Sequence, residues 1–132
     1  MNRSIAYYNE NAEDFFNRTV HVDLLHFYQK FLALLPKEAH ILDLGCGSGR
    51  DAHYFKIQNF KITALDASEE LVKLASAHIG QNVLLMKFQE IRFQSMFEGV
   101  WANASLLHVP YETLNLILKK IHASLKEGGI LL

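Results

Sequence analysis

The stretch Ile41-Leu42-Asp43-Leu44-Gly45-Cys46-Gly47-Ser48-Gly49-Arg50-Asp51 decides how the rest of the chain is interpreted. It begins with an apolar run, passes through an acidic residue into three glycines at every second position, and ends in a segment that favours helix. Because glycine has no Cβ, such a loop can adopt left-handed backbone angles and let a ligand lie against the backbone. A turn of this kind also points the free N–H groups of the following helix at the ligand. The stretch therefore predicts a site for a nucleotide-like cofactor.

Short apolar runs and amphipathic helical patterns alternate through most of the chain. Strands that alternate with helices require right-handed crossovers and give a mostly parallel sheet covered on both faces. The expected fold is therefore α/β, Rossmann-like and doubly wound, with about five strands. The pair Gly128-Gly129 is expected to end the last helix. The pattern places strands at 40–44, 61–65, 83–88 and 99–102, a fifth from 130, and helices at 50–59, from 68 and at 111–125.

Two helices are expected before this core. Residues 7–16 carry apolar side chains at helical spacing on one face and acidic side chains on the other. Residues 23–35 carry a second helical pattern, which Pro36 ends. We therefore expect the whole chain to form one domain, with an N-terminal helical cap at 1–36 and a Rossmann-like core at 37–132.

Composition narrows the class of protein. The 132 residues are half apolar and carry a net charge of −1 with neither sign in a long run, so neither a nucleic-acid partner nor a polybasic membrane patch is expected. No apolar stretch approaches the roughly 20 residues of a membrane span, and the first residues lack the apolar core of a signal peptide. Seven scattered histidines and one cysteine give no metal-ligand spacing, so no metal is expected. These features favour a cytoplasmic protein.

Asp43 discriminates among the ligands that such a loop could hold. The spacing G-x-G-x-G differs from the G-x-G-x-x-G pattern of dinucleotide sites. A carboxylate at the end of the first strand repels a pyrophosphate but suits a ligand that carries positive charge. S-adenosylmethionine has an amino group, a sulfonium and no phosphate, and so fits this description. The alternative is a glycine-rich turn without a ligand, because such turns are common.

Asp66 is the second acidic residue of interest. It follows the second predicted strand, 17 residues beyond Gly49. In a doubly wound sheet the C-terminal ends of neighbouring strands lie side by side, and an acid there can accept hydrogen bonds from two ribose hydroxyls. The alternative is that Asp66 only caps the following helix.

The glycine loop from Asp43 to Gly49 together with Asp66 resembles the class I S-adenosylmethionine-dependent methyltransferases. The segment Val100-Trp101-Ala102-Asn103-Ala104-Ser105-Leu106-Leu107-His108-Val109-Pro110 and the pair Gly128-Gly129 resemble the same family. Within it, the small bacterial methyltransferases called tellurite-resistance-like are the most similar group. The resemblance covers nearly the whole chain.

The resemblance implies S-adenosylmethionine as cofactor, S-adenosylhomocysteine as product and methyl transfer to a small-molecule acceptor. It implies that the glycine loop surrounds the methionine part, that Asp43 holds the amino group through water, and that Asp66 binds the ribose. The residues it implies in the cofactor site are Tyr8, Asp43, Gly45, Cys46, Gly47, Gly49, Arg50, Asp66, Ala67, Phe88, Gln89 and Asn103.

Several of these residues have a specific expected role. By the resemblance, Tyr8 and Arg50 close over the methionine end of the cofactor. Relatives often carry an acid near the end of the third strand for the adenine amino group; here Lys87 stands there, and the amide oxygen of Gln89 could replace the acid. His108 lies near the expected methyl group, either as a general base or as a packing or acceptor-lining residue. No obligatory catalytic side chain is expected, because the cofactor brings the reactive group.

Two features near the C-terminus bear on activity. The family sheet has seven strands, whereas this chain supplies about five and stops at Leu132 inside an apolar run. We therefore expect a truncated domain that lacks the last two strands and forms a homodimer through the exposed sheet edge. A non-catalytic cofactor-binding or assembly module and a structural fragment that binds nothing alone are the alternatives. An NAD-dependent oxidoreductase fits less well, because of Asp43 and the loop spacing.

Overall fold

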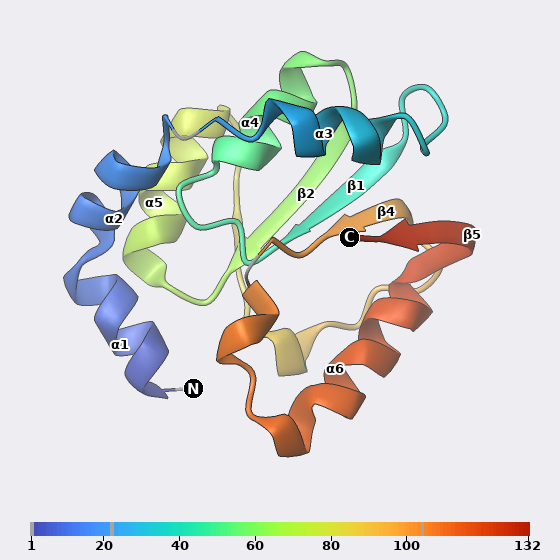
Figure 1. The fold of residues 1–132 in the computed structure, drawn as a ribbon. Coiled ribbons are helices and arrows are strands. Elements are labelled where there is room, and N and C mark those ends of the chain that lie inside the picture. The colour runs from blue at the N-terminus through green and yellow to red at the C-terminus, as the bar shows by residue number, and fades with distance from the viewer. Residues whose placement is uncertain (1, 22, 104) are drawn as a thin grey trace.

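The computed structural model describes residues 2–21, 23–103 and 105–132. They form an α/β fold around a parallel five-stranded sheet with the order β3-β2-β1-β4-β5 (Figure 1). This confirms the predicted fold class. The strands are β1 (His40–Leu44), β2 (Lys61–Asp66), β3 (Leu84–Leu85), β4 (Phe97–Trp101) and β5 (Leu125–Leu131), and the α-helices are α1 (Asn2–Glu10), α2 (Ala12–Thr19), α3 (Leu25–Leu32), α4 (Arg50–Ile57), α5 (Glu69–Ile79) and α6 (Tyr111–Ser124). Two short 3₁₀ helices complete the order, η1 (Phe88–Glu90) and η2 (Ser105–His108).

The central strand β1 separates two apolar layers because its side chains alternate between the two faces. Ile41 belongs to the layer that contains residues of α3, α4 and α5. Leu42 and Leu44 belong to the layer that contains residues of α6. By the same alternation Asp43 lies on the side of α4, inside the first layer. The sheet is therefore covered on both faces, and a carboxylate is buried where an apolar side chain would be expected.

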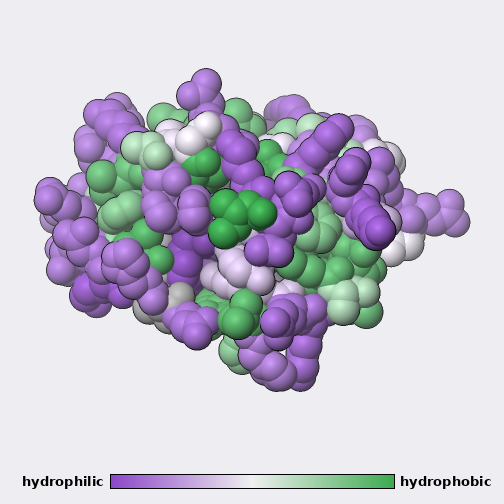
Figure 2. All heavy atoms as spheres, turned by 90° about the horizontal axis from the view of Figure 1, so that it is seen from above, coloured by the Kyte–Doolittle hydropathy of each residue, from purple (hydrophilic) through white to green (hydrophobic). Residues whose placement is uncertain are grey.

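The surface on the side of α3 and α4 agrees with this arrangement. Figure 2 shows mostly hydrophilic side chains there, with apolar ones visible in patches between them. The helices thus turn their apolar faces inward, as Tyr28 and Phe31 of α3 and Phe55 of α4 do. Among the residues that the structure describes, no helix is both long and apolar enough to cross a membrane.

Several predicted boundaries were wrong, among them the start of the fifth strand, which was expected at 130 and lies at Leu125. The single helix expected at 7–16 is two helices that meet at Asn11, whose backbone is not helical (φ −114°, ψ 16°). The strand expected at 83–88 is only two residues long, since the chain turns into η1 at Phe88. Gly128 and Gly129 do not end α6, because β5 begins directly after it and contains both.

The position of the glycine pair inside β5 has a physical reason. Leu125 pairs with Phe97, but Ile130 pairs with Gly99, so β5 carries extra residues between the two pairings. Gly128 has φ +77°, a left-handed angle that accommodates such a bulge at little cost. The glycines therefore shape an irregular edge strand. The homodimer expected through this edge stays a prediction.

Candidate cofactor site

A cavity of about 220 Å³ lies at the C-terminal ends of β1 and β2. In a parallel sheet this is the edge where ligands bind, because the strand ends and the loops after them converge there. The N-terminal helices α1 and α2 form another wall of the cavity. The residues that line it are Ile5, Tyr8, Phe15, Gly45, Gly47, Asp66, Ala67, Ser68, Leu71, Phe88, Asn103, Ser105 and Leu107.

The glycine loop between β1 and α4 requires glycine for two different reasons. At Gly45 a Cβ would lie 2.7 Å from the Cβ of Ser105, in the segment after β4, so a side chain there would collide with another wall of the cavity. At Gly49 a Cβ would lie 3.0 Å from the side chain of Ile79 in α5. Both residues also have left-handed φ angles, +74° and +83°. Gly45 therefore shapes the cavity, whereas Gly49 lets α4 begin close to α5.

Asp66 ends β2 and lines the cavity. One carboxylate oxygen accepts a hydrogen bond from the N–H of Gly47 at 2.9 Å, and the other accepts from the N–H of Ser68 at 3.0 Å. Burial raises the pKa of Asp66, and these N–H donors counteract the rise. The N-cap of α5 is Ser68, whose hydroxyl accepts from the N–H of Leu71 at 3.3 Å. Asp66 thus fixes the glycine loop and is not itself the helix cap.

Asp43 lies outside the lining of the cavity, on β1 directly before the loop. Its side chain is 2 % exposed, and its Oδ2 has no hydrogen-bond partner among the described residues. Burial raises the pKa of Asp43 well above its usual range, and the negative charges of Asp51 and Asp66 add to the rise. Arg50 and the backbone N–H of Ala52 oppose it. The site therefore holds a buried acid that lacks a cation of its own.

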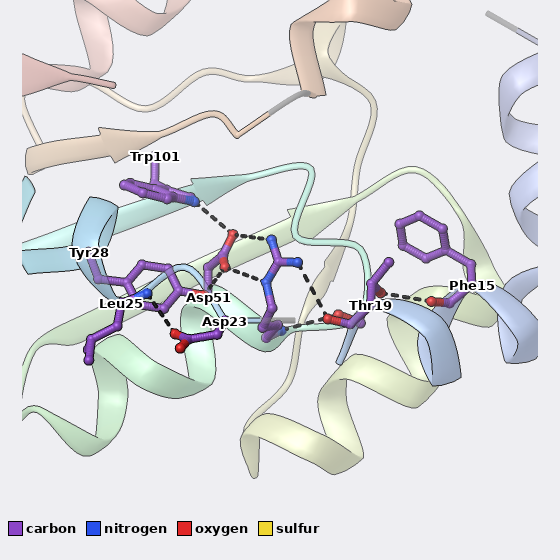
Figure 3. A network of polar contacts seen from close by, with 9 residues as sticks. Phe15, Thr19, Asp23, Leu25, Tyr28, Asp51 and Trp101 are labelled. Carbon is purple, nitrogen blue, oxygen red and sulfur yellow. Dashed lines mark hydrogen bonds and ion pairs between the residues drawn. The ribbon is translucent and has the colours of Figure 1, made fainter. Parts of the chain in front are cut away.

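Arg50 lies outside the cavity lining, and its guanidinium forms hydrogen bonds with other parts of the protein. Its Nε donates to Oδ1 of Asp51 at 2.8 Å, and its Nη1 donates to the carbonyl of Thr19 at 3.4 Å. Asp51 also accepts from the indole Nε1 of Trp101 at 2.8 Å and from the hydroxyl of Tyr28 (Figure 3). The network joins α3, α4 and β4. In the structure the guanidinium of Arg50 pairs with Asp51, and its expected contact with the methionine end of the cofactor stays a prediction.

The cavity brings together seven of the twelve residues expected to hold the cofactor: Tyr8, Gly45, Gly47, Asp66, Ala67, Phe88 and Asn103. The other five, which lie outside its lining, are Asp43, Cys46, Gly49, Arg50 and Gln89. Of these, Gln89 has a buried side-chain oxygen without a partner in the described part of the chain. Cys46 is buried, which raises the pKa of its thiol. The side chain of His108 lies outside the described residues.

Six further lining residues had no predicted function. Phe15 was expected only on the apolar face of a helix, yet it lies 3.0 Å from the position of a Cβ on Gly47. Ser105 has a buried hydroxyl without a partner among the described residues. Helical periodicity marked Phe15 as buried, but only the fold shows what it packs against. The missed residues are Ile5, Phe15, Ser68, Leu71, Ser105 and Leu107.

Comparison with known proteins identifies the class of this fold and site. A family described as methyltransferase domain matches residues 41–129. A ubiquinone biosynthesis O-methyltransferase of Xanthomonas axonopodis pv. citri is 30 % identical over 103 residues, which are 73 % of this chain and 42 % of that protein. The chain belongs to this methyltransferase domain family. It spans about half the length of the curated relatives it matches.

Two solved structures extend the comparison. The 1,6-didemethyltoxoflavin-N1-methyltransferase of Burkholderia thailandensis, crystallised with 1,6-didemethyltoxoflavin and S-adenosylhomocysteine, has a TM-score of 0.77 at 27 % identity, over 96 % of this chain and 59 % of that one. A TehB-like SAM-dependent methyltransferase of Corynebacterium glutamicum has a TM-score of 0.75 at 19 % identity, over 98 % of this chain and 73 % of that one. At 19 % identity, the likeness to the Corynebacterium glutamicum structure shows a shared fold.

Replacing Asp51 with asparagine should destabilise the protein. Asp51→Asn turns one acceptor oxygen into a donor that faces other donors, and it leaves Arg50 without its partner. We expect the free energy of unfolding in urea to fall by about 2–4 kcal/mol. Asp14→Asn breaks another Asp–Arg pair, the exposed one with Arg18, and should have little effect. Equal losses in the two variants would contradict a structural role for the Asp51 network.

Asp43 should make the stability of the ligand-free protein depend on pH. The folded state binds this proton more tightly than the unfolded chain, in which the pKa lies near 3.8. The stabilisation is therefore complete below that value and is lost as pH rises through the higher folded pKa. Asp43→Asn should remove this loss, so the variant should gain stability relative to wild type as the pH rises above about 4. Urea denaturation at several pH values measures the difference, and a constant difference would refute the expectation.

Proposed function

We propose that this chain binds S-adenosylmethionine and transfers its methyl group to a small-molecule acceptor. The observation that carries the proposal is the buried Oδ2 of Asp43, which has no partner among the described residues and lies directly before a glycine loop. A buried carboxylate of this kind favours a ligand that brings a positive charge. The chemistry of the site therefore fits the amino group and sulfonium of S-adenosylmethionine.

The roles of the other residues follow from where they lie. Asp66 is the carboxylate in the cavity lining and would accept hydrogen bonds from the ribose hydroxyls. The buried side-chain oxygen of Gln89, next to the lining residue Phe88, would accept from the adenine amino group. Phe88 and Leu71 supply apolar wall for the adenine ring. In both polar assignments an oxygen of the protein accepts a hydrogen bond from a donor group of the cofactor.

When bound, S-adenosylmethionine supplies an activated methyl group on sulfur. The chain has to bind and orient the cofactor and to exclude water from it. Tyr8 and Phe15 of the N-terminal helices and Leu107 beyond β4 enclose the cavity with mostly apolar surface. Alignment of donor and acceptor at near-attack distance can supply several kcal/mol of the barrier. His108 remains our candidate for a general base that removes a proton from the small molecule to which the methyl group is transferred.

A second cavity of about 240 Å³ supports an apolar small molecule as the acceptor. It is lined by Leu24, Phe27, Trp101, Asn103 and Leu132, so its wall is mainly aliphatic and aromatic. Asn103 lines both cavities, which makes them neighbours. Two of the relatives reported above also bear the names of small molecules. A non-catalytic cofactor-binding module is the second candidate, because the lining of the first cavity accounts for cofactor binding without a catalytic side chain.

The proposal predicts selective binding of the reaction product. S-adenosylhomocysteine should raise the melting temperature of the protein and NAD should not, because only ligands of the native state stabilise it. Stabilisation by NAD alone would overturn the assignment. Incubation with radiolabelled S-adenosylmethionine and small phenols or N-heterocycles then distinguishes the enzyme from the non-catalytic module. Binding without transfer to any acceptor would favour the module.

Asp66→Ala should weaken binding of S-adenosylhomocysteine by about 1–3 kcal/mol, the contribution of hydrogen bonds to a charged group. Isothermal titration calorimetry measures the change. Asp14→Ala, an exposed aspartate outside the cavity lining, is the control and should bind like the wild type. An unchanged affinity of Asp66→Ala would remove Asp66 from the site.

A further inference from the structure

We infer that Asn9 is a positioning residue that holds helices α1 and α2 against the turn that carries Asp66 and thereby slows release of the cofactor. The cap here means these two helices, and the latch means the contact that Asn9 makes. The inference rests on the proposed function, because it assigns Asn9 a role in the same site. It starts from a hydrogen bond between segments far apart in sequence: the hydroxyl of Ser68 donates to Oδ1 of Asn9 at 2.7 Å.

The first argument is that the hydroxyl of Ser68 can donate only one hydrogen bond, and the side-chain oxygen of Asn9 accepts it. As the N-cap of α5, the Ser68 oxygen accepts from the N–H of Leu71 at 3.3 Å, so its proton is free for another partner. Ser68 is only 1 % exposed. Without Asn9, this buried hydroxyl would lose the acceptor it has in the structure, which costs more than the loss of an exposed hydrogen bond.

The second argument is that Asn9 also caps α5 from another helix. The N–H of Glu70 points to the same Oδ1 of Asn9 at 3.4 Å. N–H groups in the first turn of a helix have no partner inside the helix, so an acceptor from α1 satisfies one of them. One oxygen atom thus holds α1 on the first turn of α5, and Figure 1 shows the N-terminal helices beside α5.

The third argument is that Ser68, the point of attachment, itself lines the cavity, two residues beyond Asp66. The N–H of Ser68 donates to Asp66 at 3.0 Å, and Asp66 accepts from Gly47 at 2.9 Å. A continuous series of hydrogen bonds therefore runs from Asn9 through Ser68 and Asp66 to the glycine loop. Movement of the cap away from α5 would disturb the carboxylate that we assign to the ribose.

The fourth argument is that the residue next to Asn9 belongs to the cavity wall. Ile5 and Tyr8 of α1 line the cavity, and with Asn9 they lie on one helix face at i, i+3 and i+4. The ring of Tyr8 packs edge-on against Phe15 of α2, with centroids 5.0 Å apart. Phe15 in turn lies against Gly47. The cap therefore contacts the cavity lining at two points, through Phe15 at Gly47 and through Asn9 at Ser68.

The test measures the dissociation rate of S-adenosylhomocysteine by stopped flow. Asn9→Ala should raise this rate about fivefold to tenfold, the effect of one to two hydrogen bonds. Asn9→Asp keeps the acceptor oxygen and places a negative charge at the N-terminus of α5, where such a charge is favourable. This variant should therefore keep the slow dissociation of the wild type. Asn17→Ala, on the exposed part of α2, is the matched control and should leave the rate unchanged.

A wild-type dissociation rate in Asn9→Ala would overturn the inference, even with a lower melting temperature, because a merely structural role changes stability alone. Hydrogen exchange of the α1 amides in the ligand-free protein tests the latch separately from cofactor binding. Faster exchange in Asn9→Ala than in Asn17→Ala supports the latch, and equal exchange refutes it. If the wild type binds no S-adenosylhomocysteine, the proposed function fails, while this exchange measurement still decides whether Asn9 holds the cap.

Discussion

The partly buried ion pair between Arg50 and Asp51 is the interaction on which the electrostatics of the site depend. Asp51 is 6 % exposed and accepts hydrogen bonds from Arg50, Trp101 and Tyr28. A buried carboxylate is costly unless its lone pairs are occupied in this way. The guanidinium beside the glycine loop is therefore committed to Asp51. Asp43 lies in the same buried layer and makes no ion pair with Arg50, whose charge only partly offsets the rise of the Asp43 pKa.

The parallel sheet then brings a second acid to the same place. β1 and β2 pair in register, with Asp43 opposite Ala64 and Leu44 opposite Leu65, so Asp66 extends one residue beyond the end of β1. That position lets its carboxylate bond to Gly47 and fix the loop. The negative charges of Asp51 and Asp66 both raise the pKa of Asp43. Arg50 pairs with Asp51, so Asp43 and Asp66 remain in this small region without an ion pair of their own.

Much of the core could be predicted from local pattern. The strand expected at 40–44 coincides with β1, and Ser68 and Asp66 fall where the alternation of strand and helix places them. Periodicity and turn chemistry are local properties, so they suffice for these elements. They failed for Gly128-Gly129, because a bulge in an edge strand and a helix C-terminus both favour left-handed glycine.

The roles of Arg50, Phe15 and Asn9 could not be predicted in this way. Arg50 meets Trp101 only through Asp51, and Asn9 meets a residue 59 positions away. Such contacts depend on how the cap docks on the core. An amphipathic pattern shows which face of a helix is buried but not which neighbour it is buried against. Apart from Tyr8, which the resemblance implies, the wall of the cavity that α1 and α2 supply is therefore the part of the site that required a structure.

Charge is what separates the ligands that this backbone geometry could accept. Left-handed glycines and a helix N-terminus suit a pyrophosphate as well as they suit a methionine chain. A pyrophosphate, however, would add negative charge next to Asp66 and Asp43, neither of which pairs with a cation among the described residues. A ligand with an ammonium and a sulfonium would add positive charge near Asp43, where the charge of Arg50 offsets only part of the cost of burial. The acids around the loop, more than the loop itself, therefore favour S-adenosylmethionine over a dinucleotide.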